Sequence, residues 1–335
     1  MPEDEAPISI PLPQVSAPIV GRSAAFAHVR ELIDKVKDLD APVLIAGESG
    51  TGKELVARAI HDSGARRGGQ FVAVNCGAIP DHLLESELFG YVRGAFTGAL
   101  RDKAGLIEDA HKGTFFLDEI GDLSFPLQAK LLRLLQEKEI RRVGENRTRA
   151  VDVRFISATN KDLDREIEQG RFREDLFYRL RIVTIDIPPV RERREDLLLL
   201  LNHFAEKYAR QMKKEKVYFT PGALDLLMRY GWPGNVREIQ NEIQRSLILC
   251  GADRFIREEY LSPKINPKEI VSARGENNFF EAKAEFVRRF LNQALEKHDY
   301  NKARTAEEIG ISRQGLFKLM KKHRIGESNG EEKNT

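Results

Sequence analysis

The chain has 335 residues, and its 54 Lys and Arg side chains nearly balance 52 Asp and Glu, which leaves a formal net charge of +2. At roughly 100–200 residues per domain this length predicts two or three domains, and the flat charge balance excludes a uniformly basic nucleic-acid-binding surface. Cys76 and Cys250 form no CxxC pair and the histidines no HExxH pattern, which excludes a disulfide scaffold, a cysteine-based zinc site and a zincin. Because the longest apolar run, Leu197–Leu201, is far shorter than the ~20 residues that span a bilayer, we expect a cytoplasmic protein with no membrane partner.

The N-terminal half has the pattern of an α/β fold. Residues 1–17 contain four prolines and three acidic residues, which predicts a flexible arm and argues against a signal peptide. From 18 to 187, short apolar runs alternate with helical patterns such as Lys53–Ser63 and Pro126–Glu137. The runs are Val43–Ala46, Phe71–Val74, Thr114–Leu117, Val153–Ala158 and Val183–Ile187. This alternation predicts a parallel sheet with helices on both faces.

The rest of the chain is predicted to be helical. Residues 188–261 show only helical periods, over Arg194–Arg210, Pro221–Arg229 and Val236–Leu249, and predict a small all-helical domain. Residues 262–277 have the composition of a linker, 278–326 are helical again, and 327–335 form a polar tail. The 278–326 module holds eleven basic and six acidic residues, so the basic excess of the chain lies there.

A glycine-rich loop follows the first apolar run and precedes a helical segment. Its residues are Gly47, Glu48, Ser49, Gly50, Thr51, Gly52 and Lys53. The glycines let backbone N–H groups surround a phosphate, while the helix N-terminus and Lys53 add positive charge, so the pattern predicts a phosphate site. The general motif places Ser or Thr after the lysine to bind Mg²⁺, and here that residue is Glu54. Thr51, a water or other acids would then have to complete the metal shell.

Three further segments carry groups that a nucleotide-hydrolysing site needs. The apolar run ending in Asp118 and Glu119 could supply a metal ligand, directly or through water, and an acid that polarises the attacking water. An acidic strand end that caps the next loop is the alternative. Asn160 ends another run, where an amide could sense a γ-phosphate or simply form a turn. Arg173 and Arg179 could be solvated, ion-paired, or directed at a neighbouring subunit's nucleotide, and local sequence does not choose.

Together these motifs resemble the AAA+ ATPases, and further segments narrow the resemblance to the sigma-54-dependent transcription activators, the bacterial enhancer-binding proteins. GAFTGA at 94–99, preceded by ELFGYVR, is the signature loop of that family, and GESGTGKE with Glu54 is its usual Walker A form. WPGNVRE at 232–238 is similar to its sensor II segment, and PPVRERREDL at 188–197 to its inter-subdomain segment. The resemblance runs from about Ile19 to Ile325 and implies an AAA+ α/β subdomain, a helical lid and ATP with Mg²⁺ as ligands.

The resemblance implies a role for each matching residue of the nucleotide site. Lys53 would bind the β- and γ-phosphates, and Asp118, as the magnesium ligand, would form Walker B with Glu119. Asn75 matches the switch residue that pairs with the Walker B glutamate. Thr159 and Asn160 match sensor I, and Arg237 matches sensor II. Arg173 and Arg179 match the trans-acting arginine fingers, and Val20 and Gly21 the adenine-binding pair. The fingers would place each active site between subunits.

The signature loop consists of Gly94, Ala95, Phe96, Thr97, Gly98 and Ala99. Its glycines and alanines permit backbone rearrangement, while Phe96 and Thr97 offer an apolar ring and a hydroxyl; the resemblance implies that it engages sigma-54. The basic segment 141–149 is by resemblance the neighbouring pore-side loop, although a solvated hairpin fits equally well.

The C-terminal module has the pattern of a helix-turn-helix. Ala303, Ala306 and Ile309 give one helix an apolar face, Gly310 permits a tight turn, and Ser312 can cap a second helix. Leu316, Leu319 and Met320 would face the core, and the opposite face carries Arg313, Gln314, Lys318, Lys321, Lys322 and Arg324. Such a face suits a major groove, with a basic helix for protein contact as the alternative. The module resembles a Fis-type domain, which implies a dimerisation helix at Glu281–Lys297.

The leading functional hypothesis is an ATPase that binds double-stranded enhancer DNA, assembles from dimers into a hexameric ring and uses GAFTGA to remodel sigma-54 RNA polymerase. The runner-up is a DNA-binding regulator whose nucleotide site drives only oligomerisation, and another AAA+ remodeller such as a helicase loader is a third possibility. About 17 residues precede the ATPase, whereas a sensory domain needs ~100. We therefore expect either a stand-alone activator controlled by its abundance or by a regulatory partner protein, or a fragment of a longer activator.

Overall fold

The computed structural model describes residues 19–97, 99–267 and 287–325 other than 289, 293, 296, 299 and 324. It divides into two compact units, residues 1–262 and 263–335. The predicted arm at 1–17, the tail at 327–335, and parts of the predicted linker and of the helix Glu281–Lys297 lie outside the described residues. Among the described residues, no helix has the length and apolar character that crossing a membrane requires.

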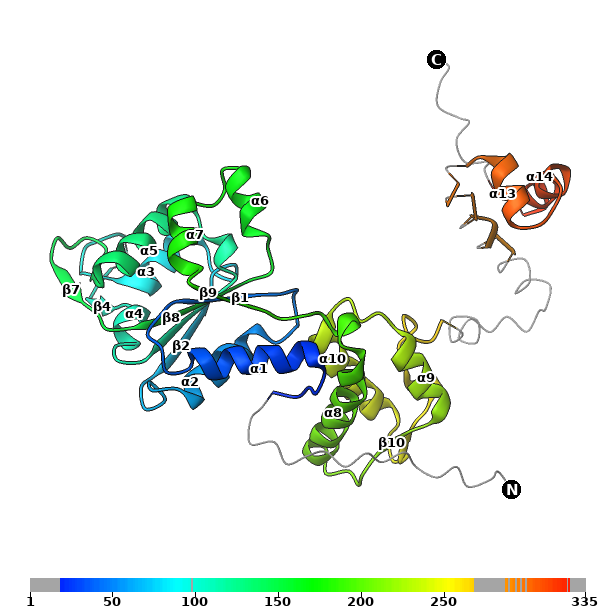
Figure 1. Ribbon diagram of the computed structural model, residues 1–335, viewed down its shortest axis with the longest axis horizontal. Helices are drawn as coiled ribbons and strands as arrows, with labels where there is room; N and C mark the ends of the chain where they lie inside the picture. Colours follow the sequence, from blue (N-terminus) through cyan, green and yellow to red (C-terminus); the bar gives the residue numbers. More distant parts are fainter. Residues whose placement is uncertain are drawn as a thin grey trace, which may run out of the picture. The chain divides into compact units, whose positions relative to one another are not determined.

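The first unit is built on a parallel five-stranded sheet (Figure 1). Its strand order is β2-β5-β8-β1-β9, and every neighbouring pair runs parallel. The strands are β1 (Val43–Ala46), β2 (Phe71–Asn75), β5 (Thr114–Asp118), β8 (Arg154–Thr159) and β9 (Val183–Asp186). Each coincides with a predicted apolar run to within one residue at either end, and the predicted α/β class is confirmed.

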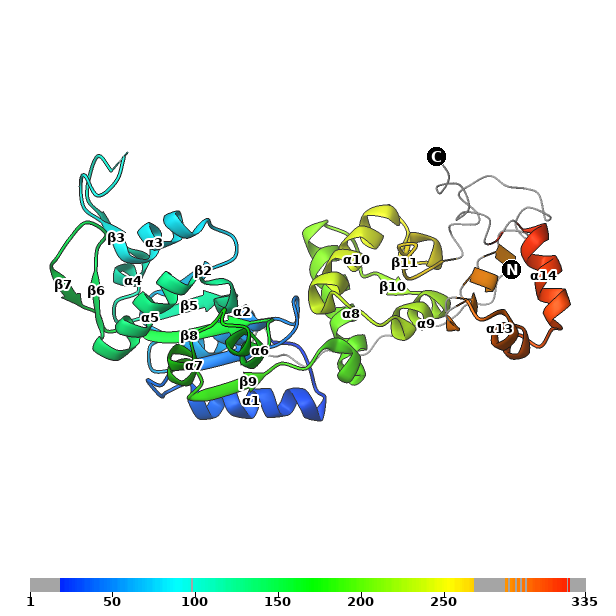
Figure 2. The ribbon, with the colours of Figure 1, turned by 90° about the horizontal axis from the view of Figure 1, so that it is seen from above.

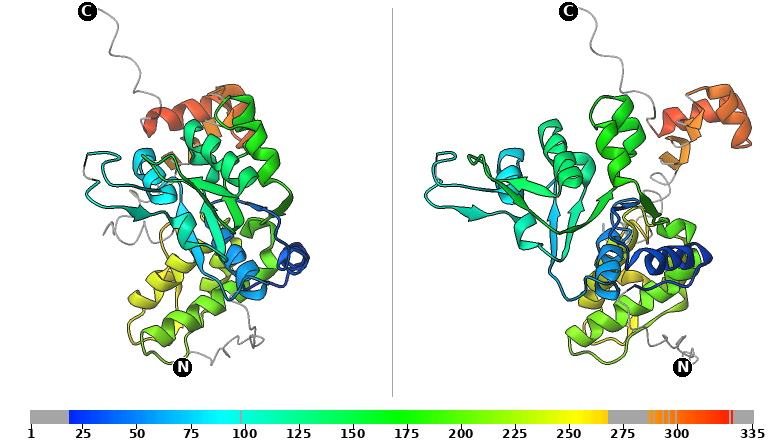
Figure 3. Two further views of the ribbon diagram at one scale, coloured as in Figure 1. Left: turned by 90° about the vertical axis from the view of Figure 1, so that its left-hand side faces the viewer. Right: turned by 60° about the vertical axis from the view of Figure 1, so that its left-hand side comes forward.

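Helices cover both faces of this sheet (Figure 3). On one face, α1 (Ala24–Val36) and α2 (Lys53–Ser63) pack with Phe116 and Ile156. On the other face, the buried side chains of five further helices pack with Phe115 and Phe155. Adjacent residues of β5 and β8 thus point to opposite faces, as strand geometry requires. The helices of the second face are α3 (Asp81–Phe89), α4 (Leu106–Asp109), α5 (Phe125–Glu137), α6 (Leu163–Glu168) and α7 (Glu174–Leu180).

Two small antiparallel hairpins project from one end of this α/β part (Figure 2). The first pairs β3 (Gly90–Tyr91) with β4 (Lys103–Ala104), and the segment between them contains the GAFTGA residues. The second pairs β6 (Glu139–Arg141) with β7 (Thr148–Ala150). The segment 141–149, predicted as either a pore-side loop or a solvated hairpin, therefore belongs to a hairpin.

The lid contains α8 (Leu197–Gln211), α9 (Pro221–Arg229) and α10 (Asn235–Leu249). These match the three predicted helices, except that Arg194–Asp196 forms a 3-10 turn before α8. Thr220 caps α9 through its side chain, with Pro221 at the first helical position, where the missing N–H costs nothing. The all-helical prediction for the lid is wrong in one detail, because β10 (Tyr218–Phe219) pairs with β11 (Phe255–Ile256).

The second unit contains α13 (Lys302–Glu308) and α14 (Arg313–Lys322). The side chain of Asn301 caps α13 and that of Ser312 caps α14, and Gly310 between them has a φ of +70°, which favours glycine. The core of the unit includes Leu291, Leu295, Ala306, Leu316, Met320 and Ile325. Ala303, predicted on the apolar face, is exposed, and the buried neighbour on α13 is Thr305.

Candidate functional site

The glycine-rich loop connects the end of β1 to the start of α2, as predicted. Gly50 and Gly52 have φ values of +78° and +103°, which strain any other residue. A Cβ atom on Gly50 would also lie 2.4 Å from the carbonyl oxygen of Gly234, at the edge of the lid. The loop therefore needs its glycines both for its curvature and for the close approach of the lid.

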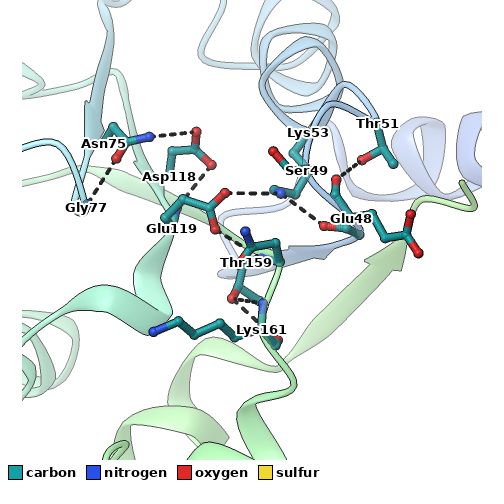
Figure 4. A network of polar contacts seen from close by, with 12 residues as sticks. Glu48, Ser49, Thr51, Lys53, Asn75, Gly77, Asp118, Glu119, Thr159 and Lys161 are labelled. Carbon is teal, nitrogen blue, oxygen red and sulfur yellow. Dashed lines mark hydrogen bonds and ion pairs between the residues drawn. The ribbon is translucent and has the colours of Figure 1, made fainter. Parts of the chain in front are cut away.

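Lys53 lies between the loop and the acidic end of β5 (Figure 4). Its buried ammonium donates to the carbonyl oxygen of Gly47 at 3.0 Å and lies 3.4 Å from the Glu119 carboxylate. Glu119 has a φ of +54°, and its other carboxylate oxygen accepts from the backbone N–H of Asn160 at 3.1 Å. Glu119 follows β5, Asn160 follows β8, and Lys53 starts α2 after the loop that leaves β1, so the three meet at the carboxyl ends of neighbouring parallel strands.

Asp118 precedes Glu119 and is half-buried. Burial raises the pKa of Asp118 above its usual range, and the negative charge of Glu119 raises it further. The side-chain amide of Asn75 donates to Asp118 at 3.4 Å, and the amide oxygen of Asn75 accepts from the N–H of Gly77. Here Asn75 contacts Asp118, whereas the predicted partner is Glu119, so the switch role stays a prediction.

The donor chemistry of the site fits a magnesium ion. Mg²⁺ binds proteins through one or two carboxylates and takes its remaining ligands from phosphates and water. Asp118 and Glu119 offer two adjacent carboxylates, and burial together with the charge of Glu119 raises the pKa of Asp118, which a bound cation would counteract. Glu54 forms an ion pair with Arg58 at 2.9 Å, and the Thr51 hydroxyl donates to the carbonyl oxygen of Glu48. The role of Asp118 as the magnesium ligand therefore stays a prediction that its chemistry fits.

A cavity of about 590 Å³ extends from the glycine-rich loop to the lid. The loop, Asp118 and Glu119 line it together with the predicted adenine residue Val20 and the predicted sensor II residue Arg237. Gly21, the other predicted adenine residue, is buried next to Phe26 and Asp196 and does not line the cavity. From the lid, α8 and α10 contribute Leu200, His203, Phe204, Lys207, Val236 and Gln240. The cavity has the size of a small-molecule site and is polar at the loop end.

The lid holds the loop through contacts that the sequence did not predict. Arg191 binds the Glu48 carboxylate with two N–H donors, at 2.7 and 2.5 Å. The buried Asn235 donates to Glu48 and to the carbonyl oxygen of Ser49, both at 3.1 Å, and accepts from the N–H of Val190. These bonds lower the pKa of Glu48 to about 2. Arg237 adds a bond to the Ser49 hydroxyl at 3.1 Å.

A second junction joins the lid to the segment that carries Val20. The fully buried carboxylate of Asp196 accepts from the backbone N–H groups of Arg22 and Ser23 and from the Ser23 hydroxyl. Beside it, the buried guanidinium of Arg193 donates to the carbonyl oxygen of Thr51 and lies over the ring of Phe26. Burial lowers the pKa of Arg193. The PPVRERREDL motif thus contributes Arg191, Arg193 and Asp196 to the lid junction.

The predicted fingers lie at the two ends of α7. Arg173 caps its start, and its guanidinium pairs with both oxygens of Asp175, at 3.0 and 2.7 Å, over the ring of Phe125. Arg179, in the last turn, donates to the carbonyl oxygen of Leu135 and is otherwise exposed.

The GAFTGA segment lies beside the 141–149 hairpin. The N–H of Val92 donates to the carbonyl oxygen of Val143, and a Cβ atom on Gly144 would lie 2.8 Å from that of Ala95. The ring of Phe96 packs edge-on against Tyr91 at 5.0 Å and is 43% exposed; Thr97 is exposed, and Ala99 is buried. Gly94 bonds Ala99 through its N–H, which closes the loop. Gly98 lies outside the described residues.

The predicted DNA-binding face of α14 is exposed. Ser312 is occupied as the helix cap, accepting from the N–H of Gly315 at 3.0 Å. The exposed side chains are Arg313, Gln314, Lys318, Lys321 and Lys322, while Arg324 lies outside the described residues. Phe317, 60% exposed on the same helix, was not predicted to belong to this face.

The fold is that of the AAA+ class of P-loop NTPases, because a five-stranded parallel sheet carries a glycine-rich phosphate loop and a helical lid follows it. A helix-turn-helix unit comes next in the chain. Residues 19–186 match the sigma-54 interaction domain, 191–277 the AAA+ ATPase lid domain, and 284–323 the Fis family of bacterial regulatory proteins. The chain belongs to the sigma-54-dependent transcription activators, as its resemblance implied, and its DNA-binding module is of the Fis type.

Relatives match over nearly the whole chain. The transcriptional regulatory protein ZraR of Escherichia coli K12 is 46% identical over 302 residues, which are 89% of this chain and 67% of that protein. The regulatory protein AtoC of the same organism is 44% identical over 313 residues, 92% of this chain and 68% of that protein. The crystal structure of NtrX from Brucella abortus in complex with ATP has a TM-score of 0.71 at 34% identity, covering 92% of this chain and 70% of that one.

Proposed function

We propose that this activator hydrolyses ATP at sites between the subunits of a ring, and that its GAFTGA loop uses the cycle to convert the closed sigma-54 RNA polymerase complex into the open one. The observation that carries the proposal is the contact of Lys53 with Glu119 at 3.4 Å on the wall of a cavity that the lid completes. The related NtrX has been crystallised with ADP and with ATP, which supports a nucleotide as the ligand of that cavity.

The charges of the site suggest how hydrolysis is controlled. Phosphate oxygens would compete with Glu119 for the ammonium of Lys53, so ATP binding would free Glu119 to orient the attacking water. Mg²⁺, when bound, neutralises phosphate charge, and Asp118 would hold it, directly or through water. Arg237 would sense the phosphates from the lid, with Asn160 as sensor I, and Asn75 would restrain the Walker B carboxylates.

The position of the two predicted finger arginines supports a shared active site. The cavity is lined by Asp118, Glu119 and the loop, whereas Arg173 and Arg179 belong to α7 and are not among its walls. We propose that they complete the site of the neighbouring subunit, where guanidinium groups stabilise transition-state charge. Homo-oligomerisation, from dimer to hexameric ring, is then a condition of activity. Enhancer DNA would bind the basic face of α14, with side chains near the helix start at base edges and Lys318, Lys321 and Lys322 at phosphates.

The test is binding of the full chain to purified sigma-54 with ATP, with ADP, or with ADP and aluminium fluoride as a transition-state mimic. We expect a stable complex with the mimic only, and its loss in the Thr97→Ala variant, whose ATPase rate should be unchanged. Absence of a complex in every nucleotide state, with ATPase activity intact, would instead favour a regulator that uses ATP for assembly alone.

A further inference from the structure

The buried side-chain amide of Gln128 joins the turn that follows β5 to the segment that carries the proposed finger Arg173. Gln128 lies in the first turns of α5 and is fully buried. Its Nε2 donates to the carbonyl oxygen of Leu123 at 2.8 Å and to that of Arg171 at 2.9 Å. Its Oε1 accepts from the backbone N–H of Arg173 at 2.8 Å.

Gln128 is a polar side chain in an otherwise apolar environment. Its neighbours on α5, including Leu127, Leu131 and Leu132, belong to the hydrophobic core of this face of the sheet. A buried polar group is costly unless it is hydrogen-bonded, and an apolar side chain of similar volume would pack there without that requirement. The three bonds of Gln128 therefore point to a geometric role that an apolar residue could not perform.

Two of these bonds hold the backbone directly at the finger. The carbonyl of Arg171 and the N–H of Arg173 flank Phe172, which is itself buried. Arg173 is the N-cap of α7, so the bond from its N–H fixes the point from which its side chain starts. Asp175 and Phe125 then orient the guanidinium.

The third bond reaches toward the subunit's own nucleotide site. Leu123 follows the 3-10 turn Ile120–Asp122, which begins directly after Glu119. The N–H of Asp122 donates to the carbonyl oxygen of Glu119 at 2.9 Å, so the turn is tied to the Walker B residue. The Gln128 side chain therefore contacts two backbone segments. One follows the Walker B acids of its own subunit, and the other carries the finger that would act on the next subunit.

We propose that Gln128 is a positioning residue for the trans-acting finger: it fixes the backbone of Arg173 relative to Walker B of the same subunit. The proposal rests on the proposed function, because it presumes hydrolysis between subunits with Arg173 as a finger. Loss of the three bonds should leave nucleotide binding intact and misplace the finger, and a misplacement of about 1 Å can cost ~10²-fold in rate.

The experiment uses full-length Gln128→Met, which keeps the side-chain volume and removes the bonds. We expect an ATP Kd within twofold of wild type and a kcat for hydrolysis at least tenfold lower. The variant is then mixed with Glu119→Gln, which cannot hydrolyse ATP but retains a correctly held finger. In a ring with head-to-tail interfaces, random 1:1 mixing pairs an intact Walker B with an intact finger at about one interface in four, so about a quarter of the wild-type rate should return.

The controls separate this role from others. Val29→Ala, a buried change in α1 on the opposite face of the sheet, should lower the melting temperature without the tenfold loss of kcat. If Gln128→Met does not fold, Gln128→Glu replaces it, because it keeps the volume and an acceptor for the N–H of Arg173 but lacks the two donors.

Three results would overturn the proposal. The first is wild-type hydrolysis by the variant. The second is a mixture that stays inactive while Arg173→Ala mixed with Glu119→Gln regains activity, which would place the defect in the variant's own site. The third is full hydrolysis by Arg173→Ala alone, which would remove Arg173 as a finger and with it this proposal, while an intersubunit site completed by Arg179 would still stand.

Discussion

The junction at Asp196 allows a stability effect to be worked out from the contacts. Its carboxylate is fully buried and accepts from the N–H of Arg22 and from the N–H and hydroxyl of Ser23. In Asp196→Ala these donors lose their acceptor; the bond from the Ser23 N–H is buried, and that from the Arg22 N–H is part-buried. Each unsatisfied buried backbone donor costs ~1–3 kcal/mol, so the two N–H groups alone predict a loss of about 3 kcal/mol in the free energy of unfolding.

The matched variant is Asp196→Asn, which has nearly the same shape. One side-chain oxygen remains to accept from the two N–H groups, and the Ser23 hydroxyl can rotate to accept from the new amide. We therefore expect a loss of only ~1 kcal/mol, about the value of one hydrogen bond. At ~2–4 °C per kcal/mol for a unit of this size, the melting temperature should fall by about 6–12 °C in the alanine variant and about 2–4 °C in the asparagine variant.

The assay is urea and thermal unfolding of the full chain, followed by circular dichroism, with ATP binding measured on the folded variants. Because Asp196 fixes the segment that carries Val20, and Val20 lines the cavity, Asp196→Ala should also raise the Kd for ATP, while Asp196→Asn should leave it near wild type. Equal losses in the two variants, or a loss below about 0.5 kcal/mol in the alanine variant, would refute the assignment of Asp196 as a buried acceptor that holds the lid.

Four further outcomes are expected. Glu119→Gln should abolish ATP turnover while ATP still binds, and a normal phosphate-release rate would contradict its role as the acid that orients water. Thr97→Ala should spare ATP hydrolysis but block open-complex formation, as permanganate footprinting would show; retained melting of the promoter would count against the loop. Neutralising Lys318 and Lys321 should weaken DNA binding and flatten its salt dependence by ~1 unit of slope per lost phosphate contact, so an unaltered slope would mean that these lysines do not touch phosphate. The pKa of Glu48 in the folded protein is about 2, against a usual 4.5, so its bonds stabilise the fold fully above pH 4.5 and are lost as the pH falls toward 2. In Glu48→Gln the melting temperature should therefore fall less steeply across that pH window. A fall identical to that of wild type would show that Glu48 is not its cause.

The strands could be predicted from sequence because each one is an apolar run with a sharp boundary. Val43–Ala46 ends at the glycine of the phosphate loop, and Thr114–Asp118 ends at two acids, so the change in chemistry marks both the end of the strand and the edge of the site. The two-residue strands β10 and β11 gave no such signal, because two residues carry no period. Ala303 was placed on the apolar face by helical spacing alone, whereas the buried position belongs to Thr305, whose hydroxyl bonds the carbonyl oxygen of Asn301.

The contacts that hold the site could not be predicted in the same way. Asp196 bonds a residue 173 positions away, and Asn235 bonds one 187 positions away. Periodicity and local propensity describe neighbours along the chain and say nothing of such pairs. A recognised motif also drew attention to only some of its members. WPGNVRE pointed to Arg237, whose side chain makes one bond to the loop, whereas the side chain of Asn235 makes two.

The start of α10 shows how the lid can follow the state of the loop. Trp232 and Asn235 have φ values of +51° and +53°, and for a bulky residue such as tryptophan this conformation is costly. Strain of this kind persists only where the surroundings over-determine it. Here the Trp232 ring is buried with its N–H bonded to Leu227, the amide of Asn235 bonds Glu48 and Val190, and the N–H of Arg237 bonds the carbonyl oxygen of Gly50. Because the strained turn is held by the loop itself, we expect a shift of the loop around a phosphate to change the bonds that hold the turn and so to move the lid.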